Sequence, residues 1–214
     1  MSEIAPCITV ETPEQYNAMV EKIKPFAKRV QIDISDGQFS PVLMVPPDKL
    51  WWPKEWVVDI HAMVNSPMDY LNSLIKLKPN LIIFHVETGV DLVSIMKTIR
   101  QYGIKAGVAI LKPSVPLDYE EIIKEADHVL VFCGDLGYYG GKASLMQLEK
   151  VRLIKAINPK AEIGWDGGVN IENAFTLSQG GVDVLNSGGA IGNAENPSEI
   201  YDKLVSEINK QGVI

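Results

Sequence analysis

The stretch VQIDISDG, residues 30–37, begins as a hydrophobic strand and ends in polar residues and a glycine. Because the side chains of a β-strand point alternately to its two faces, Val30, Ile32 and Ile34 share one face and Asp33 points from the other. The apolar face is suited to packing on helices. The sequence therefore predicts a strand that carries a carboxylate near its carboxyl end, on the face turned away from the helices.

Two more stretches have the same form, VVDIHAMV at 57–64 and IGWDGGVN at 163–170. The same alternation places His61 and Asp166 where the first stretch has Asp33. A parallel α/β barrel places its chemistry at the carboxyl ends of its strands. We therefore expect two carboxylates and an imidazole to converge at one mouth of such a barrel.

Short β-rich runs alternate with amphipathic helical runs along the whole chain. Strands are predicted at 4–10, 30–34, 57–62, 81–86, 105–110, 128–133, 161–166 and 182–187. Helices are predicted at 13–24, 67–77, 89–102, 117–125, 145–157, 171–180 and 197–210, and the connection 36–56, rich in proline and tryptophan, holds at most a short helix. Eight alternating units predict an α/β protein, a single (β/α)8 TIM barrel domain over residues 1–214. An open doubly wound sheet is the alternative.

Three glycine-rich segments follow the last three predicted strands. They are GDLGYYGGK at 134–142, DGGVN at 166–170 and NSGGAIGN at 186–193. Glycine lets the backbone approach an anion closely, and exposed amides at the start of a following helix supply donors to phosphate. Phosphates often bind after strands seven and eight of such barrels. The segments therefore indicate a phosphate site, the alternative being that the glycines only make tight turns.

The composition narrows the functional class. The chain has 214 residues and a formal net charge of −7, which argues against a general binder of nucleic acid or of anionic membranes. No stretch approaches the roughly 20 apolar residues of a membrane span, and the first residues lack the basic and apolar regions of a secretory signal. Cys7 and Cys133 are interpreted as buried thiols in a reducing compartment, so a cytoplasmic location is expected.

Eight segments carry a resemblance to a known family. They are IAPCI (4–8), QIDISDGQFSP (31–41), DIHAMVNSP (59–67), FHVET (84–88), GIKAGVAILKPSVP (103–116), YYGGK (138–142), WDGGVN (165–170) and NSGGAI (186–191). In order and spacing the chain resembles the ribulose-phosphate 3-epimerase family. The resemblance implies metal-assisted epimerisation at C3 of a phosphorylated ketose, with ribulose 5-phosphate and xylulose 5-phosphate as the leading pair.

The resemblance also implies residue roles. Asp33 and Asp166 would be the acid–base pair that works through an enediolate, and with His61 they would hold a divalent metal (zinc, iron or manganese). The implied substrate-binding residues are Cys7, Met63, Gly140, Gly141, Gly167, Gly168, Ser187, Gly188 and Gly189. A homo-oligomer is also expected. The reaction makes sense physically, because a proton α to a ketone is only weakly acidic and inversion needs a group on each face.

One departure affects the metal site. The family has a histidine ligand where this chain has Gln31, and a neutral amide oxygen is a poor ligand for a borderline metal such as zinc. The metal is therefore expected to bind weakly or not at all. Two alternatives follow from this: a sugar-phosphate-binding barrel that acts as a sensor or binding protein, or an epimerase of a hexulose 6-phosphate.

Other polar residues are predicted to support the barrel. His85 and Glu87 share the inward face of their strand and are expected to support the site. Lys105, Glu162 and Asp59 begin strands on the inward face, and they are predicted to form an ion-pair cluster at the bottom of the barrel, since buried charges need partners.

Overall fold

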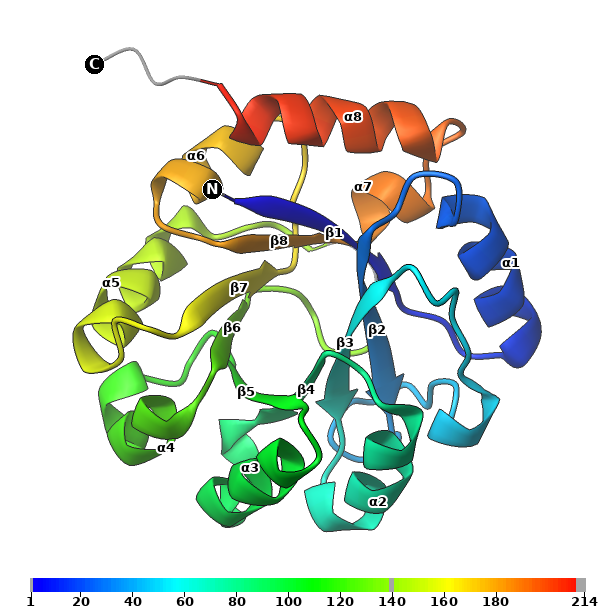
Figure 1. Ribbon diagram of the computed structural model, residues 1–214. Coiled ribbons are helices and arrows are strands. Elements are labelled where there is room, and N and C mark those ends of the chain that lie inside the picture. The colour runs from blue at the N-terminus through cyan, green and yellow to red at the C-terminus, as the bar shows by residue number, and fades with distance from the viewer. Residues whose placement is uncertain (1, 139–140, 211–214) are drawn as a thin grey trace.

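Eight parallel strands close into a barrel in the computed structural model, which describes residues 2–138 and 141–210. Figure 1 shows the ring of strands viewed along the barrel, with the helices outside it. The strands are β1 (Glu3–Ile8), β2 (Arg29–Ser35), β3 (Val57–Met63), β4 (Leu81–His85), β5 (Lys105–Ile110), β6 (His128–Phe132), β7 (Glu162–Asp166) and β8 (Val184–Ser187). Because β1 pairs with both β2 and β8, the sheet has no edge. The (β/α)8 prediction is confirmed, and the open sheet is excluded.

Helices follow the strands around the outside of the barrel. They are α1 (Pro13–Ile23), α2 (Pro67–Leu77), α3 (Leu92–Gln101), α4 (Glu120–Glu125), α5 (Leu148–Ile157), α6 (Ala174–Gln179), α7 (Gly189–Gly192) and α8 (Pro197–Ile208). Short 3-10 turns occur at η1 (Pro47–Lys49), η2 (Val86–Thr88), η3 (Pro116–Tyr119) and η4 (Leu145–Gln147). None of these described helices combines the length and the apolar composition that a membrane crossing requires.

The helices form where the sequence provides both a start signal and one apolar face. α1 begins with a capping box, in which Thr12 accepts from the backbone N–H of Gln15 and Gln15 accepts from that of Thr12. α3 buries Leu92, Ile95, Met96 and Ile99, the spacing of a single helix face. These faces cover the outer side of the barrel and leave its interior to the other side of each strand.

The strand register places the polar side chains beside one another. Asp33 lies opposite His61 in the β2–β3 pair, and Asp166 lies opposite Asn186 in the β7–β8 pair. β1 ends at Ile8, two residues before the predicted end, so the residues after it form a loop at the mouth. The carboxyl ends of the strands therefore bring distant parts of the chain to one place.

The opposite end of the barrel holds a charged cluster, made of Arg29, Asp59, His128 and Glu162 and called the Arg29 cluster below. Arg29 lies 2.6 Å from Asp59 and 2.7 Å from Glu162, and His128 Nδ1 lies 2.8 Å from the same Glu162 carboxylate. Asp59 and Glu162 were predicted here, but the prediction of Lys105 as their cation was wrong. Lys105 is exposed at the first residue of β5, whereas Arg29 is only 5% exposed and reaches both acids.

Candidate active site

Asp33, His61 and Asp166 meet inside the mouth of the barrel. One potential ligand atom from each lies within 4.8 Å of the others, and all three residues are buried. His61 Nδ1 lies 3.1 Å from Asp33 Oδ1 and 3.9 Å from Asp166 Oδ2. The structure thus brings together the three residues that strand alternation singles out.

A chain of hydrogen-bonding groups lies behind His61. His61 Nε2 is 2.8 Å from His85 Nε2, and His85 Nδ1 is 3.3 Å from Glu87 Oε2. The other Glu87 oxygen accepts from the backbone N–H of Leu111 at 2.8 Å. Both rings are fully buried, so each ring position is fixed from behind. His85 and Glu87 therefore support His61 from behind, and the His85 ring also packs against Phe132 in the cavity wall.

The hydrogen bonds that run from His61 through His85 to Glu87 also indicate which nitrogen of His61 carries a proton. Burial lowers the pKa of His85 to about 4, so its ring is neutral and has one N–H. Its Nδ1–H donates to the Glu87 carboxylate, so its Nε2 accepts from His61 Nε2–H. With its proton on Nε2, His61 can present the Nδ1 lone pair to a metal held by the two carboxylates, which is the form a metal ligand needs.

Asp33 and Asp166 occupy different surroundings. Asp33 Oδ2 accepts from the hydroxyl of Thr9 at 2.6 Å. Burial and, second, the negative charge of Asp33 together raise the pKa of Asp166 to about 7. Two carboxylates whose oxygens lie within 4.8 Å of each other therefore oppose each other's ionisation unless a cation lies between them.

Gln31 supplies a partial substitute for that cation. Its Nε2 donates to Asp33 Oδ1 at 2.9 Å and to Asp166 Oδ2 at 2.5 Å. Its Oε1 is buried and has no hydrogen-bond partner among the described residues. Sequence reasoning considered Gln31 only as a weak ligand, because the bridge to Asp166 joins residues 135 positions apart and sequence alternation does not reveal it.

The donor set suits a divalent cation. Two carboxylate oxygens and an imidazole lone pair are common ligands of zinc, manganese and iron, and a catalytic metal site commonly has three protein ligands with one open position. The unpartnered Gln31 oxygen is a fourth candidate donor. Asp33, His61 and Asp166 are therefore the residues that could hold a metal here.

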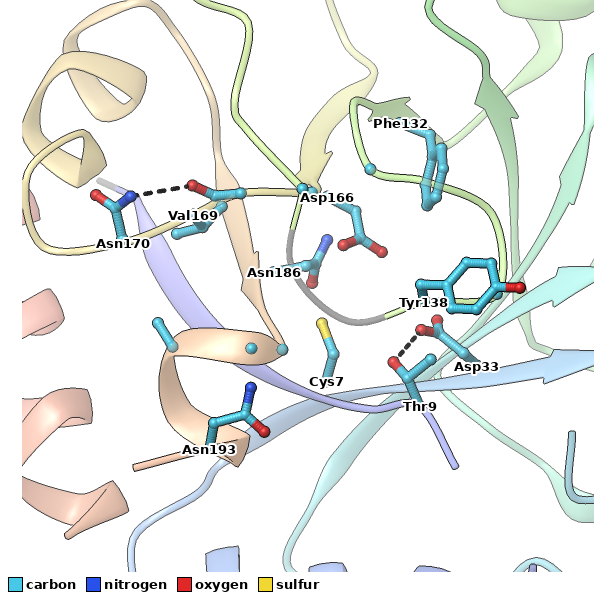
Figure 2. Close-up of a pocket in the computed structure, with 18 of the residues that line it drawn as sticks. Cys7, Thr9, Asp33, Phe132, Tyr138, Asp166, Val169, Asn170, Asn186 and Asn193 are labelled. Carbon is cyan, nitrogen blue, oxygen red and sulfur yellow. Dashed lines mark hydrogen bonds between the residues drawn. The ribbon is translucent and has the colours of Figure 1, made fainter. Parts of the chain in front are cut away.

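A cavity of about 270 Å³ opens above these groups. Figure 2 shows Asp33 and Asp166 on its wall, with Thr9 hydrogen-bonded to Asp33. Of the predicted binding residues, the cavity is lined by Cys7, Met63, Gly141, Gly167, Gly168, Gly188 and Gly189. Gly140 lies outside the described residues. Ser187 is buried below the lining with its hydroxyl directed to the carbonyl of Val169, at 3.5 Å.

Several lining residues were missed by sequence reasoning. They are Thr9, Phe132, Tyr138, Asn170, Asn186 and Asn193. Asn186 could have been found, because it shares the inward face of β8 with Val184, two residues earlier, and lies opposite Asp166 in the β7–β8 pair. Thr9 shares the face of Cys7 within the strand predicted at 4–10, so alternation could have found it as well, although β1 ends at Ile8. Tyr138 lies in a loop, where strand alternation makes no prediction.

Glycines hold the loops after β6 and β7 in close contact. At Gly167, where φ is +104°, a Cβ atom would overlap the backbone nitrogen of Gly134. At Gly168 it would overlap the nitrogen of Ala143. The N–H of Cys133 also donates to the carbonyl of Asp166 at 2.6 Å. These two glycines are therefore required by the packing of the loops whatever ligand the cavity takes.

The two cysteines lie at or near the site but are poor nucleophiles. Burial, with added repulsion from Asp166 and Asp33, raises the pKa of the Cys7 thiol well above its ordinary value. Burial likewise raises the pKa of Cys133 to about 12. Because the thiolate is the reactive form, Cys7 contributes to the cavity as a neutral lining group.

Comparison with solved structures supports the fold. A 3-hexulose-6-phosphate synthase from Salmonella typhimurium superposes with a TM-score of 0.72 at 14% identity, covering 96% of this chain and 98% of that one. A Streptococcus mutans protein described as KGPDC gives a TM-score of 0.71 at 8% identity, with 97% of each chain covered. At such low identity these similarities establish the barrel alone.

Comparison of sequences identifies the family. The model of the ribulose-phosphate 3 epimerase family matches residues 3–192. The ribulose-phosphate 3-epimerase of Rhodobacter capsulatus is 30% identical over 216 residues, which cover 96% of this chain and 93% of that protein. That of Buchnera aphidicola subsp. Baizongia pistaciae is 28% identical over 81% of each chain. The chain therefore belongs to the ribulose-phosphate 3-epimerase family.

Proposed function

We propose that the protein is a 3-epimerase of a ketose phosphate, with ribulose 5-phosphate and xylulose 5-phosphate as its substrate pair. The observation that carries the proposal is the placement of two buried carboxylates, Asp33 and Asp166, with the His61 lone pair beside a cavity bordered by glycine-rich loops. The cavity of about 270 Å³ suits a small polar ligand, since drug-sized ligands occupy pockets of roughly 300–1,000 Å³.

The two aspartates would carry out the proton transfers. One carboxylate takes the proton from C3, and the other returns a proton to the opposite face of the resulting enediolate, so the configuration inverts. In the reverse direction the two groups exchange roles. The Thr9 hydroxyl orients Asp33 through its hydrogen bond of 2.6 Å. A divalent cation held by Asp33, His61 and Asp166 would supply the positive charge that makes the C3 proton more acidic.

The phosphate is assigned to the other side of the cavity. Gly168, Gly188 and Gly189 line it with backbone and no side chain. Backbone N–H groups can approach phosphate oxygens closely at such positions. This assignment separates the binding group from the reacting aspartates, so each can be tested alone.

A second candidate is a sugar-phosphate sensor without catalysis. The bridge from Gln31 to both aspartates favours it, because the bridge engages one oxygen of each carboxylate. The hexulose 6-phosphate alternative concerns the same site with a longer sugar. It differs from the main proposal only in the relative kcat/KM values for the two sugars.

Proton exchange in heavy water tests the proposal. Ribulose 5-phosphate is incubated with metal-free and manganese-loaded protein in D2O, and deuterium at C3 is followed by NMR. Exchange with accumulation of xylulose 5-phosphate supports the epimerase, whereas binding without exchange in either form supports the sensor. Allulose 6-phosphate is the matched substrate, and a higher kcat/KM for it would move the assignment to the hexulose phosphate.

The phosphate assignment has its own test. Gly188→Asp places a negative side chain where the phosphate is assigned, so binding of ribulose 5-phosphate measured by calorimetry should fall by at least about 100-fold, or about 2.7 kcal/mol. Gly192→Asp, in the same short helix but outside the cavity lining, is the control and should bind normally. Normal binding by Gly188→Asp would place the phosphate elsewhere.

A further inference from the structure

The two ends of the Gln31 amide have opposite surroundings. Its nitrogen lies within hydrogen-bonding distance of Asp33 and Asp166, at 2.9 and 2.5 Å. Its oxygen is buried, and within the described ranges 2–138 and 141–210 no donor reaches it. A buried polar atom without a partner costs free energy comparable to a lost hydrogen bond, so it requires an explanation.

The bridging nitrogen occupies the space next to the oxygens that a metal would use. Asp33 Oδ1 and Asp166 Oδ2 accept from Gln31, and the same two atoms face His61 Nδ1 at 3.1 and 3.9 Å. A divalent cation bound to these oxygens at about 2.0–2.2 Å would meet the positive hydrogens of the amide. The amide orientation in this structure and a bound cation are therefore electrostatically incompatible.

A half-turn about the last side-chain bond removes this conflict. The oxygen and nitrogen of an amide are nearly equal in size, so the turn exchanges them with little change in packing. In the present orientation the oxygen end has no partner among the described residues. Next to two carboxylates alone, the nitrogen is favoured, whereas next to a cation, the oxygen is favoured.

We propose that the Gln31 side chain is a metal-dependent switch of the site. Without metal its NH2 group bridges Asp33 and Asp166, and with metal it turns and its Oε1 becomes the fourth protein ligand. The proposal rests on the metal site of the proposed function but is independent of the epimerase reaction. The switch makes the aspartate pair tolerable in the metal-free protein and adds a ligand to the loaded one.

The switch also predicts which metal the site prefers. An amide carbonyl is a hard oxygen donor of the kind that suits magnesium and manganese, whereas imidazole suits zinc and iron. With Gln31 as a ligand, the site has three oxygen donors and one nitrogen donor. We therefore expect the preference for zinc over manganese to be smaller than in a Gln31→His variant of the same chain.

Calorimetry with the metals alone separates the switch from a simple bridge. Metal-free wild-type protein, Gln31→Met, Gln31→Glu and Gln31→His are titrated with MnCl2 and with ZnCl2. Methionine resembles glutamine in length but has neither amide atom, so the switch predicts at least about tenfold weaker manganese binding by Gln31→Met. If Gln31 is only a bridge, the same variant binds manganese as tightly as wild type or more tightly, because nothing competes with the metal, and this result would overturn the proposal.

The other variants and a control complete the comparison. Gln31→Glu keeps the ligand oxygen and loses the NH2 group, so it should bind manganese at least as tightly as wild type while its metal-free form melts at a lower temperature. Gln31→His should increase the preference for zinc. Gln38→Met makes the same chemical change at an exposed position and should leave metal binding unchanged. Weaker manganese binding by Gln31→Glu than by Gln31→Met would contradict a ligand role for the oxygen.

Nuclear magnetic resonance reports the turn without any enzyme assay. The side-chain NH2 signals of Gln31, assigned by their absence in Gln31→Met, should shift on adding diamagnetic Mg²⁺ or Zn²⁺ as they lose their carboxylate partners. Unchanged signals in a metal-saturated protein would refute the switch. A wild-type protein that binds neither manganese nor zinc would overturn both the switch and the metal in the proposed function, whereas metal binding and a turned amide without C3 exchange would overturn only the epimerase.

Discussion

The two ends of β7 carry acidic residues in opposite electrostatic situations. Glu162, at the start of the strand, is bound by Arg29 and His128, whose charges and hydrogen bonds hold its pKa far below the ordinary value despite the opposing effect of burial. Asp166, four residues later at the other end, lies beside another carboxylate, and burial raises its pKa to about 7. The same strand therefore carries Glu162, which is paired with the permanent positive charge of Arg29, and Asp166, which has no such partner among the described residues.

The difference separates stability from function. The Arg29 cluster has all its cationic partners within the chain, and removing one would leave a buried charge uncompensated. Asp33 and Asp166 are held by the Gln31 amide, the Thr9 hydroxyl and the neighbouring His61, and no lysine or arginine is paired with them among the described residues.

The largest expected effect is on catalysis at the Asp166 end. Asp166→Asn removes one of the two proton-transfer groups and should lower the interconversion of ribulose 5-phosphate and xylulose 5-phosphate by at least about 1,000-fold, measured by NMR in D2O. Binding of the ketose phosphate should stay within roughly tenfold, a change of about 1.4 kcal/mol. Glu162→Gln, at the other end of the strand, is the control and should keep most of its exchange activity. Full interconversion of the two sugars by Asp166→Asn would show that another group serves that face.

The next effect is on stability at the Arg29 end. Arg29→Met leaves Asp59 and Glu162 without their main cation, so the free energy of unfolding at pH 7 should fall by about 3 kcal/mol, measured by urea denaturation. Lys105→Met, in the exposed position where sequence analysis placed the cation, should change it by less than about 0.5 kcal/mol. If Arg29→Met and Lys105→Met lowered the free energy of unfolding equally, Lys105 would have to belong to the Arg29 cluster.

The pH dependence of stability should have opposite signs at the two ends. Asp166 has a raised pKa when folded, so the metal-free protein binds more protons than the unfolded chain and loses stability as pH rises from about 4 to about 7, by on the order of 4 kcal/mol. Glu162 has a lowered pKa, so its contribution is present above about pH 4 and is lost as pH falls below that value.

Denaturation of the metal-free protein at a series of pH values checks both signs. In Asp166→Asn the free energy of unfolding should no longer decline between pH 4 and 7, but it should still fall below pH 4. In Glu162→Gln the fall below pH 4 should be weaker, and the decline between pH 4 and 7 should remain. The comparison fails if Asp166→Asn keeps the full decline between pH 4 and 7.

The smallest effect concerns Thr9. Thr9→Val removes the hydroxyl that donates to Asp33 at 2.6 Å but keeps the branched shape of the side chain. The kcat of C3 exchange should fall by roughly tenfold, or about 1.4 kcal/mol, with little change in KM. Thr9→Ser keeps the hydroxyl and should retain most of the rate. An unchanged kcat in Thr9→Val would show that the Thr9 hydroxyl does not orient Asp33.

Much of the fold and the centre of the site follow from the sequence, because strand alternation and the (β/α)8 pattern fix both. Asp33, His61 and Asp166 were identified in this way, and the structure brings them together. Helix boundaries were less predictable. The predicted helix at 145–157 is divided into η4 and α5, and the short helix α7 was missed because its GAIG sequence has no amphipathic face.

The unpredicted parts depend on contacts between distant residues. Lys105 has the inward parity of its strand, but its position at the first residue leaves it exposed, so parity alone could not choose between it and Arg29. The direction of the Gln31 amide depends on two carboxylates from different strands. Such side-chain orientations follow from the closed barrel and not from any local pattern.

The contact between the β6 and β7 loops has a practical consequence for engineering the protein toward other sugars. A Cβ atom on Gly167 would overlap the backbone of Gly134, and one on Gly168 would overlap the backbone of Ala143, so libraries that randomise Gly167 and Gly168 would mostly yield chains with displaced loops. Tyr138, Asn186 and Asn193 also line the cavity and already carry side chains. Substrate scope is therefore best explored at these three positions, with the glycines kept fixed.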